Sequence, residues 1–218
     1  MLPLLIGLPE AARVRVLAIG AHPDDIEIGC TGTILKLIER EAISEVCWVV
    51  LSGDGERAAE ARHSAEALLH SVPHKQPIVC DFPDGFFPYD GQRIKDFFER
   101  LKADFSPDVI FTHQRADLHQ DHRLSCELTW NTFRDHLILE YEVPKYDGDM
   151  SAPNAFVPLD DDVRQRKIDH LMSHFTSQRS KHWFKEDLFS GLLRLRGMEC
   201  NSPTSYAEGF FCRKAMLA

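Results

Sequence analysis

A histidine and two adjacent aspartates stand close together near the start of the chain. His22, Asp24 and Asp25 occur within four residues, directly after the apolar run Val14–Gly20. Burying such groups is costly unless a positive charge neutralises them, and imidazole and carboxylate are common ligands of divalent metals. These residues therefore indicate a metal site, placed where a buried strand gives way to a helix.

A second polar cluster, containing His119, Asp121 and His122, follows the apolar run Val109–Thr112. Because the carboxyl ends of parallel strands share one edge of a sheet, the two clusters are expected to meet there. Two imidazoles and one carboxylate make a three-ligand site with an open position, where a metal turns water into a nucleophile. A nearby carboxylate then takes the proton, and another histidine stabilises an oxyanion. The residue types alone leave open whether His119 or His122 is the ligand.

Each of these residues, taken singly, has a simpler explanation. Asp25 suits a helix cap and Asp24 an exposed acid of the first turn, and both are common where helices begin. The occurrence of two such clusters at two strand ends disfavours that explanation for the whole set. His113 ends the second apolar run, and it fits a structural role as well as a supporting role beside the metal.

Apolar runs alternate with amphipathic stretches along the first two thirds of the chain. The pattern predicts buried strands at Val14–Gly20, Val46–Leu51, Ile78–Cys80 and Val109–Thr112. It predicts helices near Cys30–Glu39, Glu56–Leu69, Gln92–Ala103 and Arg123–Phe133. The alternation indicates an α/β fold, a Rossmann-like three-layer sandwich with a mostly parallel sheet and helices on both faces.

The length of the chain fits a single domain over residues 1–218. We expect an α/β core over residues 1–140, with a loop and helices of residues 141–218 completing the site. The segment Tyr141–Pro158 contains three prolines and predicts a long ordered loop. Further elements are expected as helices near Asp162–His174 and Trp183–Arg196 and a last strand at Phe210–Cys212.

Composition disfavours several classes of protein. The net charge of −9 and the lack of a basic run argue against nucleic-acid binding. No apolar stretch approaches the roughly 20 residues of a membrane helix, and the first twelve residues, interrupted by Pro3 and Pro9, are not expected to be a signal peptide. Six scattered cysteines without a C-x-x-C pair suit reduced thiols. We expect a cytoplasmic protein that acts on a small molecule, and a homo-oligomer is left open.

The two clusters also carry a resemblance to a known family. A-H-P-D-D at residues 21–25, with H-x-D-H at residues 119–122, resembles the PIG-L/LmbE-type zinc-dependent N-acetylglucosaminyl deacetylases. Residues 51–60, 82–85 and 206–210 are similar to further segments of that family, so the resemblance spans most of the chain. Gln120 departs from it, since many members have proline there, but no catalytic group is lost.

The resemblance implies a role for each member of the first cluster. His22, Asp25 and His122 would bind Zn²⁺, or another divalent metal such as Fe²⁺. Asp24 would be the general base that deprotonates the metal-bound water. Neighbours in the sequence would thus have different tasks, since Asp25 holds the metal and Asp24 moves the proton.

The resemblance further implies that His119 polarises the amide carbonyl and stabilises the oxyanion. Asp121 would hold the ring of His119 in its useful tautomer and raise its pKa. Arg57 and Asp84 are similar to substrate-contacting positions. Considered alone, Arg57 fits a solvated helix residue equally well, and Asp84 is a good turn residue.

The predicted function is that of a metal-dependent hydrolase that removes an N-acetyl group from an acetamido sugar or a GlcNAc-containing conjugate. One alternative is a 2-His-1-carboxylate Fe(II) oxygenase, although the parallel pattern counts against it and Asp24 would have no task. Another is a non-catalytic sugar- or nucleotide-binding module, although no G-x-G-x-x-G follows the first strand. The group attached to the sugar is left open, and it includes a nucleotide, a thiol precursor, an antibiotic intermediate and a glycan precursor.

Overall fold

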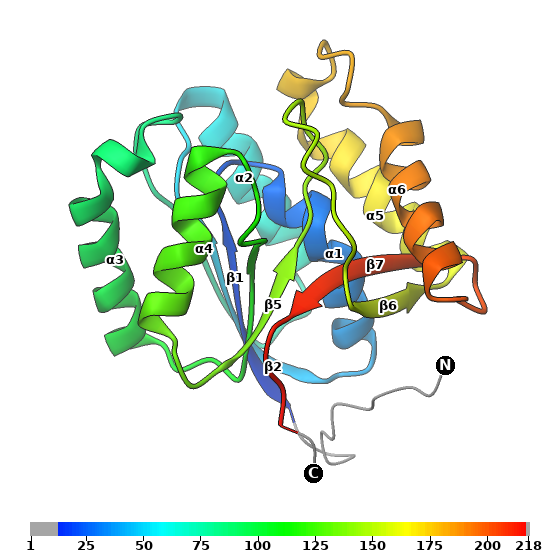
Figure 1. The fold of residues 1–218 in the computed structure, drawn as a ribbon, viewed down its shortest axis with the longest axis horizontal. Coiled ribbons are helices and arrows are strands. Elements are labelled where there is room, and N and C mark those ends of the chain that lie inside the picture. The colour runs from blue at the N-terminus through cyan, green and yellow to red at the C-terminus, as the bar shows by residue number, and fades with distance from the viewer. Residues whose placement is uncertain (1–12, 217–218) are drawn as a thin grey trace.

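A seven-stranded sheet forms the middle layer of the computed structural model, which describes residues 13–216 (Figure 1). The strands lie in the order β3-β2-β1-β4-β5-β7-β6. The strands from β3 to β5 run parallel, whereas β7 runs antiparallel to both of its neighbours. Their bounds are β1 Val14–Gly20, β2 Ile43–Val50, β3 His74–Val79, β4 Val109–His113, β5 Leu137–Tyr141, β6 Ala155–Leu159 and β7 Tyr206–Cys212.

Helices cover both faces of the sheet, which confirms the predicted three-layer α/β fold. Helices α3 and α4 pack on one face, while α1, α2, α5 and α6 lie on the other (Figure 1). The bounds are α1 Asp25–Glu39, α2 Gly55–Leu68, α3 Gly91–Asp104, α4 Gln120–Thr132, α5 Asp161–His174 and α6 Glu186–Glu199.

Strand β1 is apolar on both sides because helices cover both. Leu17 and Ile19 point into the core shared with α3 and α4, whereas Val16 and Ala18 point into the core shared with α1 and α2. Successive side chains of a strand alternate between faces, so a strand buried on both sides is a continuous apolar run. For this reason the sequence predicted the bounds of β1 correctly.

Both edge strands of the sheet contain a proline, Pro77 in β3 and Pro158 in β6. Proline has no N–H to donate to a neighbouring strand and is therefore confined to sheet edges. The half-exposed edge strands also lack a continuous apolar run. The sequence accordingly predicted β3 only as Ile78–Cys80 and did not predict β6.

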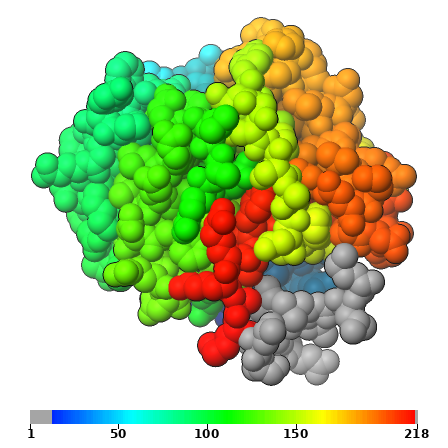
Figure 2. Space-filling model, viewed as in Figure 1, coloured from blue at the N-terminus to red at the C-terminus, as the bar shows by residue number. Residues whose placement is uncertain are grey.

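The long loop predicted over Tyr141–Pro158 is shorter in the structure. Tyr141 ends β5 and Ala155 begins β6, so the loop consists of residues 142–154. It forms a yellow-green band on the surface between the green helix α4 and the orange helix α6 (Figure 2). The prediction missed β5, although this strand begins with three consecutive apolar residues, Leu137–Leu139.

Helix α1 begins at Asp25 rather than near Cys30, where the sequence predicted it. Its first eleven residues are buried on all sides, so they show no single apolar stripe from which a helix could be recognised. The helix packs directly on Tyr141, because a Cβ atom at Gly29 would lie 2.1 Å from the ring of that tyrosine. The hydroxyl of Tyr141 in turn donates to the carbonyl of Ile19 at the end of β1.

No helix within residues 13–216 is long and apolar enough to cross a membrane. All six cysteines are free thiols, four of them buried. The prediction about the first twelve residues lies outside the described residues.

The strand order reverses at β1, because β2 and β3 are added on one side of this strand and β4 and β5 on the other. Open α/β sheets bind ligands in the crevice that such a reversal creates at the carboxyl ends of the strands. The segments that follow β1 and β4 carry the two clusters of histidine and aspartate. The fold therefore places both clusters at this crevice.

Candidate active site

Three side chains from the two clusters converge on one point. Nδ1 of His22 lies 3.2 Å from Nε2 of His122, and each of these nitrogens lies 3.5 Å from Oδ2 of Asp25. Ligand atoms of a tetrahedral zinc site, at about 2.0–2.2 Å from the ion, lie about 3.3–3.5 Å from one another. The three atoms therefore fit three corners of a tetrahedron, and the donor set suits a divalent transition metal.

Each of the two imidazoles, His22 and His122, contacts a carboxylate through its other ring nitrogen. Nε2 of His22 lies 3.1 Å from Oδ2 of Asp121, and Nδ1 of His122 lies 3.0 Å from Oδ2 of Asp117. A neutral imidazole that donates to a carboxylate through one nitrogen offers the lone pair of the other. The two carboxylates thus turn the free nitrogens of both rings toward the shared point.

The pKa values of these groups follow from burial and charge. Burial opposes protonation of His22, but hydrogen bonds to Asp121, Asp25 and Asp84 outweigh it and raise the pKa of the ring. Burial, together with the neighbouring His113, lowers the pKa of His122 to about 4. His122 is therefore neutral at neutral pH, which is the state that binds metals.

The carboxylate of Asp121 contacts the ring of His22 and not, among the described residues, the ring of His119 as predicted; only the backbone N–H of Asp121 contacts His119. Besides His22, its carboxylate accepts hydrogen bonds from the backbone N–H groups of Gly85 at 2.6 Å and Phe87 at 3.1 Å. These contacts direct the carboxylate toward the loop that follows β3. Asp121 therefore positions His22 and that loop.

His119 is the N-cap residue of helix α4. Its Nδ1 accepts a hydrogen bond from the backbone N–H of Asp121 at 3.3 Å. The proton of a neutral ring then lies on Nε2, which becomes a hydrogen-bond donor. The ring centroid lies 4.6 Å from that of His122 and 5.0 Å from that of His22, so this donor belongs to the same cluster. His122 contacts Asp25, whereas among the described residues His119 has no contact with that carboxylate within 4.0 Å.

Asp24 is buried, not the exposed acid of the simpler explanation. Its side chain is 6 % exposed, and Oδ2 has no hydrogen-bond partner among the described residues. The residue is also strained, with a φ of 91° that non-glycine residues rarely adopt. Burial raises the pKa of this carboxyl to about 7, although the charge of Arg57 opposes the shift. The fold thus holds a buried carboxyl group, one of whose oxygens has no partner among the described residues, next to a candidate metal ligand at a cost in free energy.

His113 lies beside the candidate metal ligands. Its Nε2 is 3.2 Å from Oδ2 of Asp25 and accepts from the backbone N–H of Ala21 at 2.9 Å. The ring stacks on that of His122, with centroids 3.9 Å apart. Of the two roles that the sequence left open, the contacts fit the supporting one.

The sequence analysis gave no role to Asp117 or Lys145. Asp117 accepts from the backbone N–H of His119 at 2.8 Å and from the ammonium of Lys145 at 2.9 Å, in addition to its contact with His122. Lys145 also pairs with Asp149 at 2.6 Å. Asp117 could have been found as the remaining carboxylate of the second cluster. Lys145 could not, because the path of the loop of residues 142–154 brings it there.

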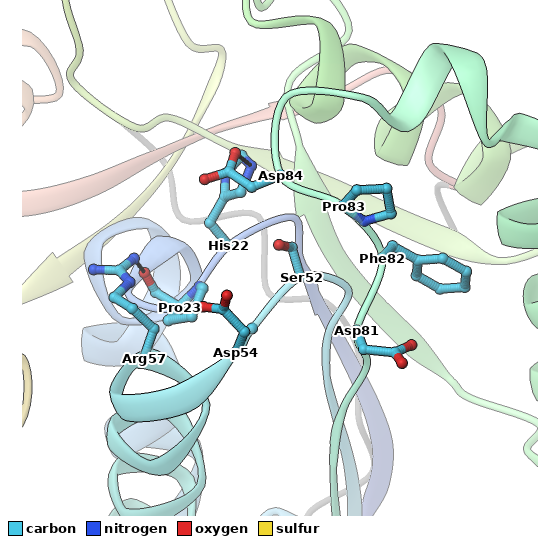
Figure 3. Close-up of a pocket in the computed structure, with 10 residues that line it drawn as sticks. His22, Pro23, Ser52, Asp54, Arg57, Asp81, Phe82, Pro83 and Asp84 are labelled. Atoms are coloured by element: carbon cyan, nitrogen blue, oxygen red, sulfur yellow. Dashed lines mark hydrogen bonds and ion pairs between the residues drawn. The ribbon is translucent and has the colours of Figure 1, made fainter.

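A cavity of about 230 Å³ opens beside His22, between the ends of β1, β2 and β3 (Figure 3). Arg57 and Asp84, the predicted substrate-contacting residues, both line it. Arg57 donates to the carbonyl of Pro23 at 2.5 Å, and Oδ1 of Asp84 lies 3.1 Å from Nε2 of His22. The structure therefore brings these two residues to the edge of the candidate metal centre.

The loop after β3 is attached to the start of α4. Gly85 has a φ of +80°, which favours glycine, and its N–H donates to Asp121. Its carbonyl accepts from the side-chain amide of Gln120 at 3.2 Å. Proline, the residue that the resemblance leads us to expect at this position, could not make that contact. Gln120 therefore links one wall of the cavity to the second cluster.

Comparison with known protein families decides where the chain belongs. The family model PIG-L, described as GlcNAc-PI de-N-acetylase, matches residues 17–133. The chain belongs to the PIG-L family. The match begins in β1 and ends just after α4, so it includes both clusters and the walls of the cavity.

Proteins similar to this chain include deacetylases and an enzyme described by a different reaction. YaiS of Escherichia coli (strain K12), described as an uncharacterized deacetylase, is 29 % identical over 139 residues, which cover 61 % of this chain and 75 % of the relative. N,N'-diacetylchitobiose deacetylase from Pyrococcus horikoshii has a TM-score of 0.70 at 23 % identity, covering 90 % of this chain and 82 % of the other. GalB, a 4-carboxy-2-hydroxymuconate hydratase from Pseudomonas putida KT2440, has a TM-score of 0.70 at 17 % identity, covering 94 % and 98 %. The shared fold therefore does not determine the reaction.

Proposed function

We propose that this PIG-L family member is a metal-dependent N-deacetylase that hydrolyses the acetamido group of an amino sugar or of a GlcNAc-containing conjugate. The observation that carries the proposal is the arrangement of three potential metal-ligand atoms, 3.2–3.5 Å apart, next to the buried Asp24, whose Oδ2 has no hydrogen-bond partner among the described residues. Its relatives, which include deacetylases, support the same class of reaction.

His22, Asp25 and His122 would hold the metal, and the donor set suits Zn²⁺ or Fe²⁺. Such a cation, when bound, lowers the pKa of a coordinated water and polarises an acyl oxygen. Asp117 and Asp121 keep the two imidazoles in the tautomers that present Nε2 of His122 and Nδ1 of His22. Because these contacts are buried, the ligands are held in place before substrate arrives.

Asp24 moves the proton. Its unpartnered Oδ2 accepts a proton from the attacking water, while Oδ1 faces Arg57 at 3.5 Å. The same carboxyl then donates that proton to the departing nitrogen as the C–N bond breaks, and the products are acetate and a free amine. Nε2–H of His119 donates a hydrogen bond to the acyl oxygen as negative charge develops on it.

The test is acetate release from a panel of acetamido sugars by the metal-loaded enzyme. Asp24→Asn keeps the shape of the side chain but cannot accept the proton, so we expect the rate to fall by about 10²–10⁴-fold with the metal content unchanged. Asp104→Asn, an exposed position at the end of α3, removes the same charge away from the site and serves as the control. Wild-type rates in Asp24→Asn, or no acetate release by the loaded enzyme from any member of the panel, would overturn the proposal.

The same assay separates the two alternatives. An Fe(II) oxygenase would consume oxygen in step with turnover, and a binding module would bind the sugar without releasing acetate. We therefore propose to record oxygen uptake and sugar binding beside acetate release, with Zn²⁺ and Fe²⁺ as separately loaded metals.

A further inference from the structure

The cavity beside His22 is lined by carboxylates. Asp54, Asp81 and Asp84 contribute to its walls, and all three residues are exposed to solvent. In Figure 3 the carboxylates of Asp54 and Asp84 lie on the side of the cavity that holds Arg57 and His22, whereas that of Asp81 points away. A ligand in this cavity therefore meets negatively charged hydrogen-bond acceptors.

Asp54 stands at the N-terminus of helix α2. Free N–H groups and the helix dipole make such a terminus attractive to phosphate. Here the position is taken by a carboxylate, which makes no capping hydrogen bond to the helix. The charge of Asp54 therefore offsets the dipole, and its oxygens are free to accept from a ligand.

Two basic groups lie near the cavity. Arg57 donates to the carbonyl of Pro23 and lies 3.5 Å from Asp24, whose charge opposes its own, while its Nη1 has no partner among the described residues. The exposed ammonium of Lys181 also acts on Asp24 through space. These two cations therefore stand against three carboxylates near the cavity, those of Asp24, Asp54 and Asp84.

The size of the cavity also limits the ligand that it can enclose. Its volume of about 230 Å³ lies below the roughly 300–1,000 Å³ that pockets for drug-sized ligands usually have. This volume suits one sugar ring, and any further group of a conjugate would extend out of the cavity.

We infer, on the basis of the proposed function, that the substrate is an acetamido sugar without phosphate on or beside the reacting ring. Its hydroxyl groups donate to the carboxylates of Asp54 and Asp84, which a phosphate would face at close range. Among the conjugates that the sequence left open, this inference disfavours nucleotide sugars and phosphorylated sugars and favours neutral glycosides.

The test compares kcat/KM of the metal-loaded enzyme for two α-anomers, methyl N-acetylglucosaminide and N-acetylglucosamine 1-phosphate. Like charges held at close range in a binding site cost several kcal/mol, so we expect the neutral glycoside to be preferred by at least about tenfold. The double variant Asp54→Asn/Asp84→Asn should reduce that preference at least about fivefold, mainly through KM for the phosphate. Added salt should reduce it too, because salt screens exposed charges. Asp104→Asn should leave the ratio unchanged.

Binding of both sugars, measured by calorimetry, keeps this inference separate from the proposed function. If neither sugar is deacetylated but the neutral one binds more tightly, deacetylation is wrong and the charge selectivity stands. The inference is overturned if the wild type has an equal or higher kcat/KM for the sugar phosphate than for the neutral glycoside. It is also overturned if the ratio of these two kcat/KM values is the same in the double variant as in the wild type.

Discussion

The metal-ligand cluster and the cavity beside it adjoin each other but are built in opposite ways. In the cluster, the proposed ligands Asp25 and His122 are buried and both contact further buried side chains. On the cavity wall, the side chain of Asp84 is 75 % exposed, and that of Asp54 does not cap its helix. The side chains proposed to perform chemistry are thus held by buried contacts before a substrate arrives, whereas those proposed to recognise it are exposed, and of these Asp84 contacts His22 at 3.1 Å.

We expect the largest effect on metal binding and activity from a substitution in the buried metal-ligand cluster. Asp25→Ala removes one of three ligands, so we expect metal affinity to fall by more than about 100-fold and acetate release to be lost. Metal content after dialysis, measured by elemental analysis, reports the change. Asp24→Asn is the matched comparison, because it should stay loaded while losing activity. A fully loaded Asp25→Ala enzyme would show that the ligands have been assigned wrongly.

We expect a smaller loss of metal affinity from substitution of a residue that contacts a proposed ligand without binding the metal itself. Asp117→Asn keeps the shape of the side chain but weakens its hydrogen bond with His122, and such changes typically lower metal affinity about 10–100-fold. Competition with a chelator measures the affinity, and the added metal at saturation should restore most of the activity. An affinity equal to that of the wild type would mean that the buried contacts of the cluster do not tune the ligands.

These contacts also show what the sequence could and could not predict. The residues of both clusters could be found because they stand directly after apolar runs, and β1 could be bounded because both of its faces are buried. The partner of Asp121 could not be found, because it depends on the direction in which the side chain leaves the first turn of α4. The edge strands β3 and β6 were missed or shortened because exposure and proline erase the apolar pattern.

Lys145 tests whether the surface loop matters for the metal centre. Lys145→Met leaves Asp117 and Asp149 facing each other without the ammonium between them, so Asp117 should hold His122 less firmly. We expect metal affinity to fall by about 3–10-fold, less than for Asp117→Asn. Lys145→Arg should recover part of the loss, and a merely destabilised protein would lower the melting temperature without changing the affinity. An unchanged affinity in Lys145→Met would separate the loop from the metal centre.

The smallest effect is expected at Gln120, the first residue of α4. Proline is well tolerated at the first position of a helix, so Gln120→Pro should lose little besides the hydrogen bond to Gly85. We expect a shift in melting temperature of no more than about 4 °C, which corresponds to about 1 kcal/mol for a chain of this size. A rise in KM with unchanged kcat would show that this hydrogen bond holds the cavity wall. A large loss of kcat would mean that the wall and the cluster are not separable.

Strand β7 lies inside the sheet although it is the last described element to be synthesised. This strand follows all other elements in the chain, yet it lies between β5 and β6 and is the one sheet neighbour of β6. Its Glu208 accepts hydrogen bonds from the backbone of Gly32 and Thr33 in α1, the helix that begins with Asp25. A ribosome completes the N-terminal part of a chain first. Helix α1, which begins with the proposed metal ligand Asp25, therefore gains these contacts only when the last described strand has been synthesised, and we expect a nascent chain lacking residues 206–212 not to retain the metal.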